Sequence, residues 1–147
     1  MIVVDASLVT QWIFREDLHE LAGEFLAEHT GHGELIAPHL FLFECTNIVR
    51  KRMRRSRLSY ADSVVALDRF LTLGVRILPD ADGDRAALHY RALELANEYD
   101  LPATYDAHYM ALAEALRCDF WTADQRLLRQ LNGRASYVRA LGEFQPQ

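Results

Sequence analysis

The chain lacks the features that mark several classes of protein. Its 147 residues include only seven glycines, four prolines and two cysteines. So little glycine and proline excludes collagen-like and low-complexity chains, and a hydrophobic content of 50% excludes an intrinsically disordered one. No run of about 18 apolar residues is present, which excludes a transmembrane helix. Cys45 and Cys118 form neither a CxxC pair nor a metal-ligand spacing, and we interpret them as free thiols of a reducing cytosol.

The start of the chain carries no pattern of a secretory signal. Asp5 follows Met1 and three apolar residues, so no apolar h-region of the usual length forms, and no positive n-region precedes it. A chain of this length buries roughly two-thirds of the surface that its unfolded form exposes, enough for one sizeable core. No linker rich in Gly, Ser or Pro divides it. We therefore expect one soluble, cytoplasmic domain over residues 1–147, with no membrane partner.

Charge is unevenly distributed along the chain. There are 16 basic and 21 acidic residues, for a net charge of −5. Six of the basic residues lie within residues 50–57, namely Arg50, Lys51, Arg52, Arg54, Arg55 and Arg57. An acidic body with one basic segment predicts two surfaces, one that collects cations and one that contacts phosphates or an acidic partner. A solvated helix face is the alternative for the basic segment.

Short apolar runs alternate with longer helical patterns. We expect strands over residues 2–4, 35–37, 75–78 and 120–122, with a weaker one over 136–138. Continuous rather than alternating apolarity is typical of strands that are covered on both faces in a parallel sheet. Apolar residues at helical spacing predict helices over 17–29, 40–55, 59–74, 88–99 and after Pro102. This alternation predicts an α/β fold in which helices sandwich a parallel sheet.

Four acidic residues stand out by their positions. Asp5 ends the first predicted strand, and Asp124 occupies the equivalent place after a later one. In open α/β sheets, ligand sites lie beyond the carboxyl ends of the strands. Asp106 lies in the first turn of a predicted helix, and Glu44 lies in an apolar segment where a charge needs a partner.

These acids have a structural and a functional interpretation. Asp106 and Asp124 lie where ordinary N-terminal acids stabilise a helix, by about 0.3–1 kcal/mol each. If all four converged on one crevice, mutual repulsion would raise their pKa values unless a cation neutralised them. Oxygen donors of this kind favour Mg²⁺ or Mn²⁺ over zinc. We therefore hypothesise an acidic divalent-metal site, next to a helix that Ser7 is placed to cap.

Four short segments carry a resemblance to a known family. In chain order they are Val3-Val4-Asp5-Ala6-Ser7, Glu44-Cys45-Thr46-Asn47, Tyr105-Asp106-Ala107-His108-Tyr109-Met110-Ala111-Leu112-Ala113 and Thr122-Ala123-Asp124. Their order resembles that of the motifs of PIN-domain nucleases, and more narrowly of the VapC-type toxins of bacterial toxin–antitoxin pairs. The resemblance extends over nearly the whole chain.

The resemblance implies a fold, an activity and partners. The implied fold is a three-layer α/β/α sandwich with a mainly parallel five-stranded sheet, and residues 1–147 would form a single PIN domain. The implied activity is Mg²⁺- or Mn²⁺-dependent cleavage of RNA by a metal-activated water, which leaves a 5′-phosphate and a 3′-hydroxyl. The implied partners are a VapB-type antitoxin, whose C-terminal segment wraps the toxin, and a second copy of the chain in a homodimer.

Residue by residue, the acidic quartet of the family matches Asp5, Glu44, Asp106 and Asp124. Asp5, Asp106 and Asp124 are the expected metal ligands. Glu44 is expected to bind a second ion or to orient the attacking water. All four positions follow the family pattern without departure.

Other residues are expected to support this site. The resemblance implies that Thr122 supports it by hydrogen bonding and that Asn47 orients its groups, and Ser7 is a further supporting residue. Tyr105 and Tyr109 lie four residues apart on one helix face and either flank the site or pack in the core. The basic residues of 50–57 are expected to contact RNA or the antitoxin.

Three other functions stay open at this point. A haloacid-dehalogenase-like phosphotransferase also has a strand-end Asp, but it needs a second Asp two positions later, where Ser7 stands. A non-catalytic PIN-like scaffold that binds RNA or protein is expected to have lost some of the acids, and all four are present. A housekeeping RNA-processing nuclease would share the site, but it would lack an upstream reading frame for a DNA-binding antitoxin.

Overall fold

The structure is a computed structural model that describes residues 1–31, 34–56, 58–78 and 85–146. Its strands are β1 (Ile2–Val4), β2 (Leu35–Pro38), β3 (Arg76–Leu78), β4 (Phe120–Thr122) and β5 (Val138–Ala140). Its α-helices are α1 (Ala6–Ile13), α2 (His19–Thr30), α3 (Leu40–Ser56), α4 (Tyr60–Thr72), α5 (Arg85–Glu98), α6 (Tyr105–Leu116) and α7 (Gln125–Leu131). The 3₁₀ turn η1 (Leu141–Glu143) follows β5.

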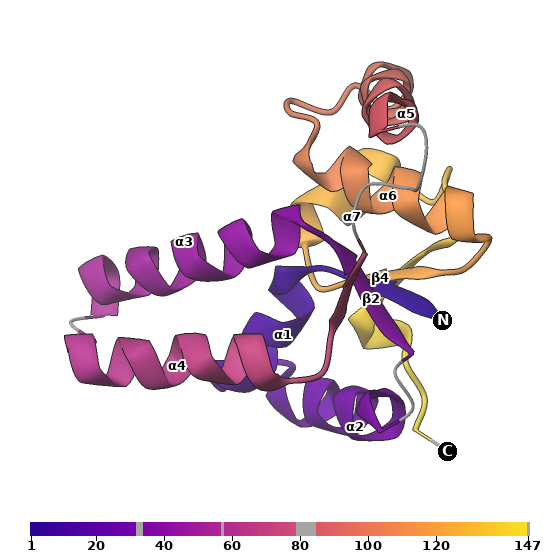
Figure 1. Cartoon of the computed structure of the whole chain (residues 1–147). Coiled ribbons are helices and arrows are strands. Elements are labelled where there is room, and N and C mark those ends of the chain that lie inside the picture. Colours follow the sequence, from indigo (N-terminus) through magenta and orange to yellow (C-terminus); the bar gives the residue numbers. More distant parts are fainter. Residues whose placement is uncertain (32–33, 57, 79–84, 147) are drawn as a thin grey trace.

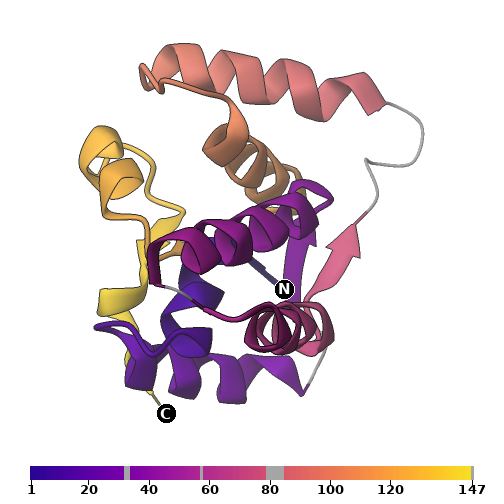
Figure 2. The same cartoon turned by 90° about the vertical axis from the view of Figure 1, so that its left-hand side faces the viewer.

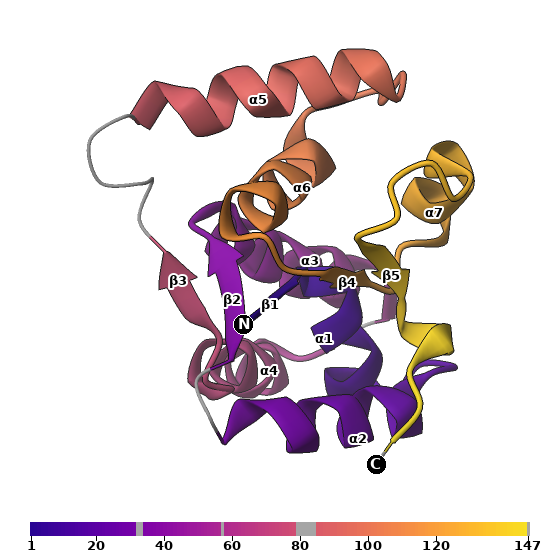
Figure 3. The ribbon, with the colours of Figure 1, turned by 90° about the vertical axis from the view of Figure 1, so that its right-hand side faces the viewer.

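The five strands form one parallel sheet in the order β3-β2-β1-β4-β5, which Figure 3 shows from its N-terminal edge. The chain proceeds from β1 outward to β2 and β3, and then crosses to the other side of β1 to form β4 and β5. The direction in which successive strands are added to the sheet therefore reverses between β1 and β4, which remain parallel and pair through Val3 and Phe120. Such a reversal opens a crevice beyond the carboxyl ends of the two strands.

Helices cover both faces of the sheet, which confirms the predicted three-layer α/β/α sandwich (Figure 3). On one face, α6 packs on β1, β2 and β4, and α5 lies outside α6. On the other face, α1 packs on β4, and α2 and α4 pack on α1. The core between the layers is apolar, as the continuous apolar runs of the strands predicted.

Helices α3 and α4 form an antiparallel pair that extends away from the sheet (Figure 1). The first turn of α3 follows directly from β2, so it lies at the carboxyl ends of the strands, and the rest of the helix projects outward. Figure 2 views the molecule from the side toward which this pair points. The basic residues before Ser56 therefore lie on the distal part of α3, namely Arg50, Lys51, Arg52, Arg54 and Arg55.

Local hydrogen bonds account for the bounds of several elements. The Ser59 hydroxyl caps α4 by accepting the Asp62 N–H at 3.0 Å. Gly74 follows the end of α4 with a φ of +91°, a conformation in which a side chain is strained. The prediction for the fifth strand is wrong by two residues. Val138 N–H first closes a turn on the Ala135 carbonyl at 3.0 Å, so the ladder begins at Val138.

The helix after β1 is capped by a different residue from the one expected. The Asp5 carboxylate accepts the Leu8 N–H at 3.0 Å and is the N-cap of α1, so the prediction that Ser7 caps this helix is wrong. Ser7 lies inside the first turn, where its hydroxyl has other partners. None of the helices in the described ranges combines the length and the apolarity that crossing a membrane requires.

Candidate active site

The carboxyl ends of β1 and β4 are joined by a network of hydroxyl groups around Asp5. Ser7 Oγ donates to Asp5 Oδ1 at 2.7 Å, and Thr122 Oγ1 donates to Asp5 Oδ2 at 2.5 Å. Ser7 Oγ also accepts the Ala123 N–H at 3.0 Å, so it ties the two strand ends together. These bonds hold the Asp5 carboxylate in one orientation at the point where the sheet order reverses. Ser7 and Thr122 thus lie where a supporting role requires them.

Asp5 is buried, with 4% of its surface exposed. Burial raises the pKa of Asp5 to about 6, although hydrogen bonds from Thr122, Ser7 and Leu8 favour its charged form. The charge of Asp124 contributes to the raised pKa of Asp5. Its Oδ1 accepts two hydrogen bonds and its Oδ2 accepts one in the described part of the chain, which leaves Oδ2 the oxygen more open to a cation.

Asp124 caps a helix and also lies beside the other acids. Its Oδ1 accepts the N–H groups of Arg126 at 2.8 Å and Leu127 at 3.2 Å, so it caps α7. Its own N–H donates to Thr122 Oγ1 at 3.0 Å, which places Asp124 beside the hydroxyl network. Its charge also acts on the other three acids. The capping role therefore does not compete with a role in the site.

Glu44 has a buried partner that the sequence did not assign. Tyr109 is fully buried in α6, stacks on Phe120 with ring centroids 5.5 Å apart, and donates its phenol hydrogen to Glu44 Oε2. Burial raises the pKa of Glu44 to about 7. The charges of the other acids contribute to this rise, and the Tyr109 hydrogen bond opposes it. Burial also holds the pKa of Tyr109 well above its usual value, so the phenol remains a donor.

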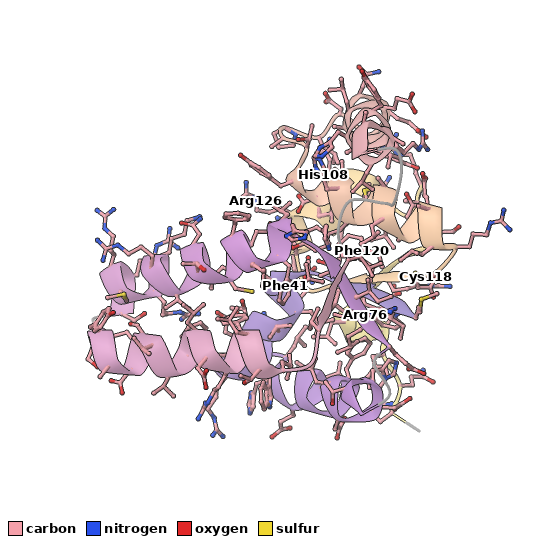
Figure 4. All side chains as sticks on the ribbon, viewed as in Figure 1. Phe41, Arg76, His108, Cys118, Phe120 and Arg126 are labelled. Carbon is pink, nitrogen blue, oxygen red and sulfur yellow. The ribbon has the colours of Figure 1, made fainter. Side chains whose placement is uncertain are left out.

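Asp106 lies in the first turn of α6, as predicted, and is partly buried. Burial raises its pKa to about 6, and the charges of Asp5 and Asp124 add to this effect. The Arg126 guanidinium opposes it. Figure 4 shows Arg126 near the region where α3 and α6 begin. Sequence reasoning missed Arg126; its signal was a cation two residues after Asp124, in the first turn of the following helix.

The four acids therefore share one electrostatic environment at the carboxyl edge of the sheet. Carboxylate oxygens are the donors that Mg²⁺ and Mn²⁺ prefer, and the mutual repulsion of these groups is what a divalent cation would relieve, so the donor set fits such an ion. Within the described ranges, no three His, Cys, Asp or Glu side chains are already arranged to hold a metal. The chemistry of the site fits a divalent ion, but the arrangement is not a closed cage.

The remaining predicted residues lie outside this network. Asn47 is exposed on α3, and in the described part of the chain no hydrogen bond joins it to an acid, so its orienting role stays a prediction. The Arg52 guanidinium pairs with Glu16 and lies 4.5 Å from the ring centroid of Phe14. The exposed basic side chains of α3 are Arg50, Lys51, Arg54 and Arg55, and Arg57 lies outside the described residues.

These pKa values predict how the stability of the metal-free protein depends on pH. The folded chain holds Asp5, Glu44 and Asp106 protonated up to a higher pH than the unfolded chain does, so between about pH 4 and 7 these groups take up protons on folding. The free energy of unfolding should therefore fall as pH rises through this window, by about 3 kcal/mol for Asp5 alone. Urea denaturation in chelator at a series of pH values measures this slope.

Saturating Mn²⁺ is the control for that measurement, because a bound cation removes the penalty on the charged acids and should flatten the slope. Stability that rises across the window in chelator would show that these acids are better stabilised in the folded state than in water. It would contradict the electrostatics described above.

Comparison with known proteins identifies the class to which this fold and this site belong. The family model of the PIN domain matches residues 2–132, and the chain belongs to the PIN-domain family. Its similar relatives within that family are VapC ribonucleases. It is 35% identical over 127 residues to Ribonuclease VapC9 of Mycobacterium tuberculosis (strain ATCC 25618 / H37Rv) and to VapC ribonuclease Mb0985 of Mycobacterium bovis. The matches cover 86% of this chain and 88% of each relative.

Solved structures confirm the fold. PAE2754 from Pyrobaculum aerophilum superimposes with a TM-score of 0.67 at 23% identity, covering 96% of this chain and 89% of that one. A toxin–antitoxin complex from Klebsiella pneumoniae gives a TM-score of 0.64 at 16% identity, covering 98% of this chain and all of the matched one. The predicted membership of the PIN family, with its α/β/α fold, is thereby confirmed.

Proposed function

We propose that this chain is an endoribonuclease that cleaves RNA phosphodiester bonds with a divalent metal, Mg²⁺ or Mn²⁺, and is the toxin of a VapC-type toxin–antitoxin pair. The observation that carries the proposal is the position of Asp5, Glu44, Asp106 and Asp124, which act on one another at the crevice where the sheet order reverses. The identity to VapC ribonucleases supports the substrate and the toxin assignment.

The roles of the residues follow from their surroundings. Asp5, Asp106 and Asp124 would hold the ion, which supplies charge stabilisation and a water of lowered pKa. Ser7 and Thr122 keep the Asp5 carboxylate oriented, so that no reorganisation is needed when substrate arrives.

Glu44 is suited to accept a proton from the attacking water. Its pKa of about 7 matches the pH at which a general base works best. Tyr109 occupies Glu44 Oε2, so Oε1 is the oxygen left to receive the proton. Arg126 lies close enough to Asp106 to lower its pKa, and it is exposed, so it can contact a phosphate without being displaced from a buried pair.

The same proposal includes the partners and the location of the protein. We infer a VapB-type antitoxin, a homodimer and an action in the cytoplasm, where RNA is available and free thiols such as Cys45 and Cys118 persist. A non-catalytic PIN scaffold is disfavoured because all four acids are present in one environment. A housekeeping nuclease would have the same site, so the presence of an upstream antitoxin gene is what separates it from a toxin.

The test is cleavage of RNA by the purified protein, with Mn²⁺ and with chelator, followed by analysis of the ends. We expect cleavage only with the ion, with products that carry 5′-phosphates and 3′-hydroxyls, because the attacking group is water. Products with 2′,3′-cyclic phosphates, formed equally in chelator, would instead indicate attack by the ribose 2′-hydroxyl and would contradict the proposal.

A further inference from the structure

Exposed aromatic rings are unevenly placed relative to the acids. Among the described residues, four aromatic side chains are more than half exposed: Phe43 (73%), Tyr60 (77%), Tyr90 (69%) and Tyr105 (60%). Two of them directly precede an acid of the site, Phe43 before Glu44 on α3 and Tyr105 before Asp106 on α6. Large apolar rings left in water beside a charged crevice indicate a surface that stacks on a ligand.

On α3, the exposed ring begins a continuous stripe. Phe41, Cys45 and Val49 face the core, so the residues on the opposite side of the helix face solvent. That side carries residues at i, i+4, i+7 and i+11, which lie one above the other on a helix: Phe43, Asn47, Arg50 and Arg54. We call these four exposed residues the α3 stripe. At about 1.5 Å per residue, the stripe is about 16 Å long, the length of a few nucleotides.

Tyr105 is the exposed ring next to Asp106 on α6. It is one turn before Tyr109 on the same face of α6, and the Tyr109 hydroxyl contacts Glu44. The exposed ring of Tyr105 therefore lies on the side of α6 that faces α3. Each of the two helices thus carries an exposed aromatic ring directly before an acid of the site, and on α3 cations follow toward the distal end.

We propose that an unpaired RNA strand runs along the α3 stripe into the site, with one base stacked on Phe43, a base beyond the scissile phosphate stacked on Tyr105, and phosphates on Arg50 and Arg54. The inference rests on the proposed function and names the side chains that guide an unpaired strand to the acids. A duplex keeps its bases stacked inside, whereas loops and ends expose bases to aromatic side chains. The stripe favours RNA over an acidic protein segment, because it combines a ring for a base with cations for phosphates.

Binding is tested with a fluorescein-labelled single-stranded RNA of about ten nucleotides, within the range that single-strand sites occupy. Fluorescence anisotropy in chelator measures affinity without cleavage, and cleavage of the same RNA with Mn²⁺ is measured in parallel. We expect Phe43→Ala and Tyr105→Ala each to weaken binding about tenfold, and Phe43→Trp to retain it. The matched control is Tyr90→Ala, which removes an equally exposed ring from α5, a helix that carries none of the four acids, and should bind as wild type does.

The cations of the stripe are tested by the salt dependence of the same affinity. The double variant Arg50→Ala/Arg54→Ala should reduce the slope of log affinity against log salt by about 0.7 for each phosphate that the protein no longer neutralises. Arg76→Ala is the control, because Arg76 is exposed on β3, away from the site (Figure 4). An unchanged slope would assign these arginines to a protein partner or to solvent and would overturn the proposed path.

The outcomes separate this inference from the function on which it rests. If wild type cleaves with Mn²⁺ and the Phe43 and Tyr105 variants bind RNA as tightly as the controls, the strand path is wrong and the ribonuclease stands. If wild type neither binds nor cleaves the RNA, the proposed function fails and the strand path fails with it.

Discussion

Asp5→Asn is expected to reduce metal-dependent RNA cleavage by about a thousandfold while the chain stays folded. The loss in activity follows from removing a charged oxygen from the centre of the acidic quartet, where preorganised electrostatic groups have their largest effect. The fold should persist because Asn is as good an N-cap as Asp and keeps an oxygen for the Leu8 N–H. Its amide can donate to Thr122 Oγ1, whose hydroxyl is 3.2 Å from Ser7 Oγ and can turn toward it.

The measurement is the single-turnover rate of RNA cleavage with Mn²⁺, with circular dichroism to monitor the fold. Asp68→Asn is the matched control, because Asp68 is exposed on α4 and the same change there should leave the rate unaltered. A folded Asp5→Asn protein that cleaves at the wild-type rate would show that Asp5 only caps α1. The candidate site would then be misplaced.

Asp106→Asn is expected to change stability and metal response in opposite directions. Burial and the charges of Asp5 and Asp124 disfavour the ionised carboxylate, so its neutral replacement should stabilise the metal-free protein at neutral pH. Discounted for partial exposure, the gain is about 1–2 kcal/mol. Functional sites commonly have this property, since arrangements that favour activity are seldom the most stable ones.

The second expected change is in the stabilisation of the protein by the metal ion. A ligand that binds only the folded state adds about 2.7 kcal/mol when it is a hundredfold above its dissociation constant. For a domain of this size, that corresponds to a rise of about 5–10 °C in melting temperature. Asp106→Asn should show a smaller rise, because it has lost a ligand.

Melting curves of wild type and variant, with chelator and with Mn²⁺, measure both the stability of the metal-free protein and its response to the ion. Asp62→Asn serves as a control of the same kind, because Asp62 is exposed in the first turn of α4, where its carboxylate accepts the Ser59 hydroxyl. If Asp106→Asn destabilises the protein in chelator and leaves its response to Mn²⁺ unaltered, Asp106 is an ordinary helix acid.

The sequence alone determined that a parallel sheet covered by helices forms, and where along the chain the acids lie. The strands at β1, β2 and β4 were predictable because continuous apolar runs persist only where both faces are buried. Asp5 and Glu44 were recognisable because a carboxylate inside an apolar segment is costly without a partner. Helices α1 and α7, with eight and seven residues, are too short for apolar periodicity to delimit.

Only the tertiary structure decided how these acids are held. The Thr122–Asp5 and Tyr109–Glu44 hydrogen bonds join residues 117 and 65 positions apart, and they exist because β4 pairs with β1 and both α3 and α6 pack on β2. The same pairing brought the Ala123 N–H to Ser7 Oγ and left Asp5 to cap α1. A local pattern records which residues are costly to bury, but strand pairing and helix packing decide which partners they meet.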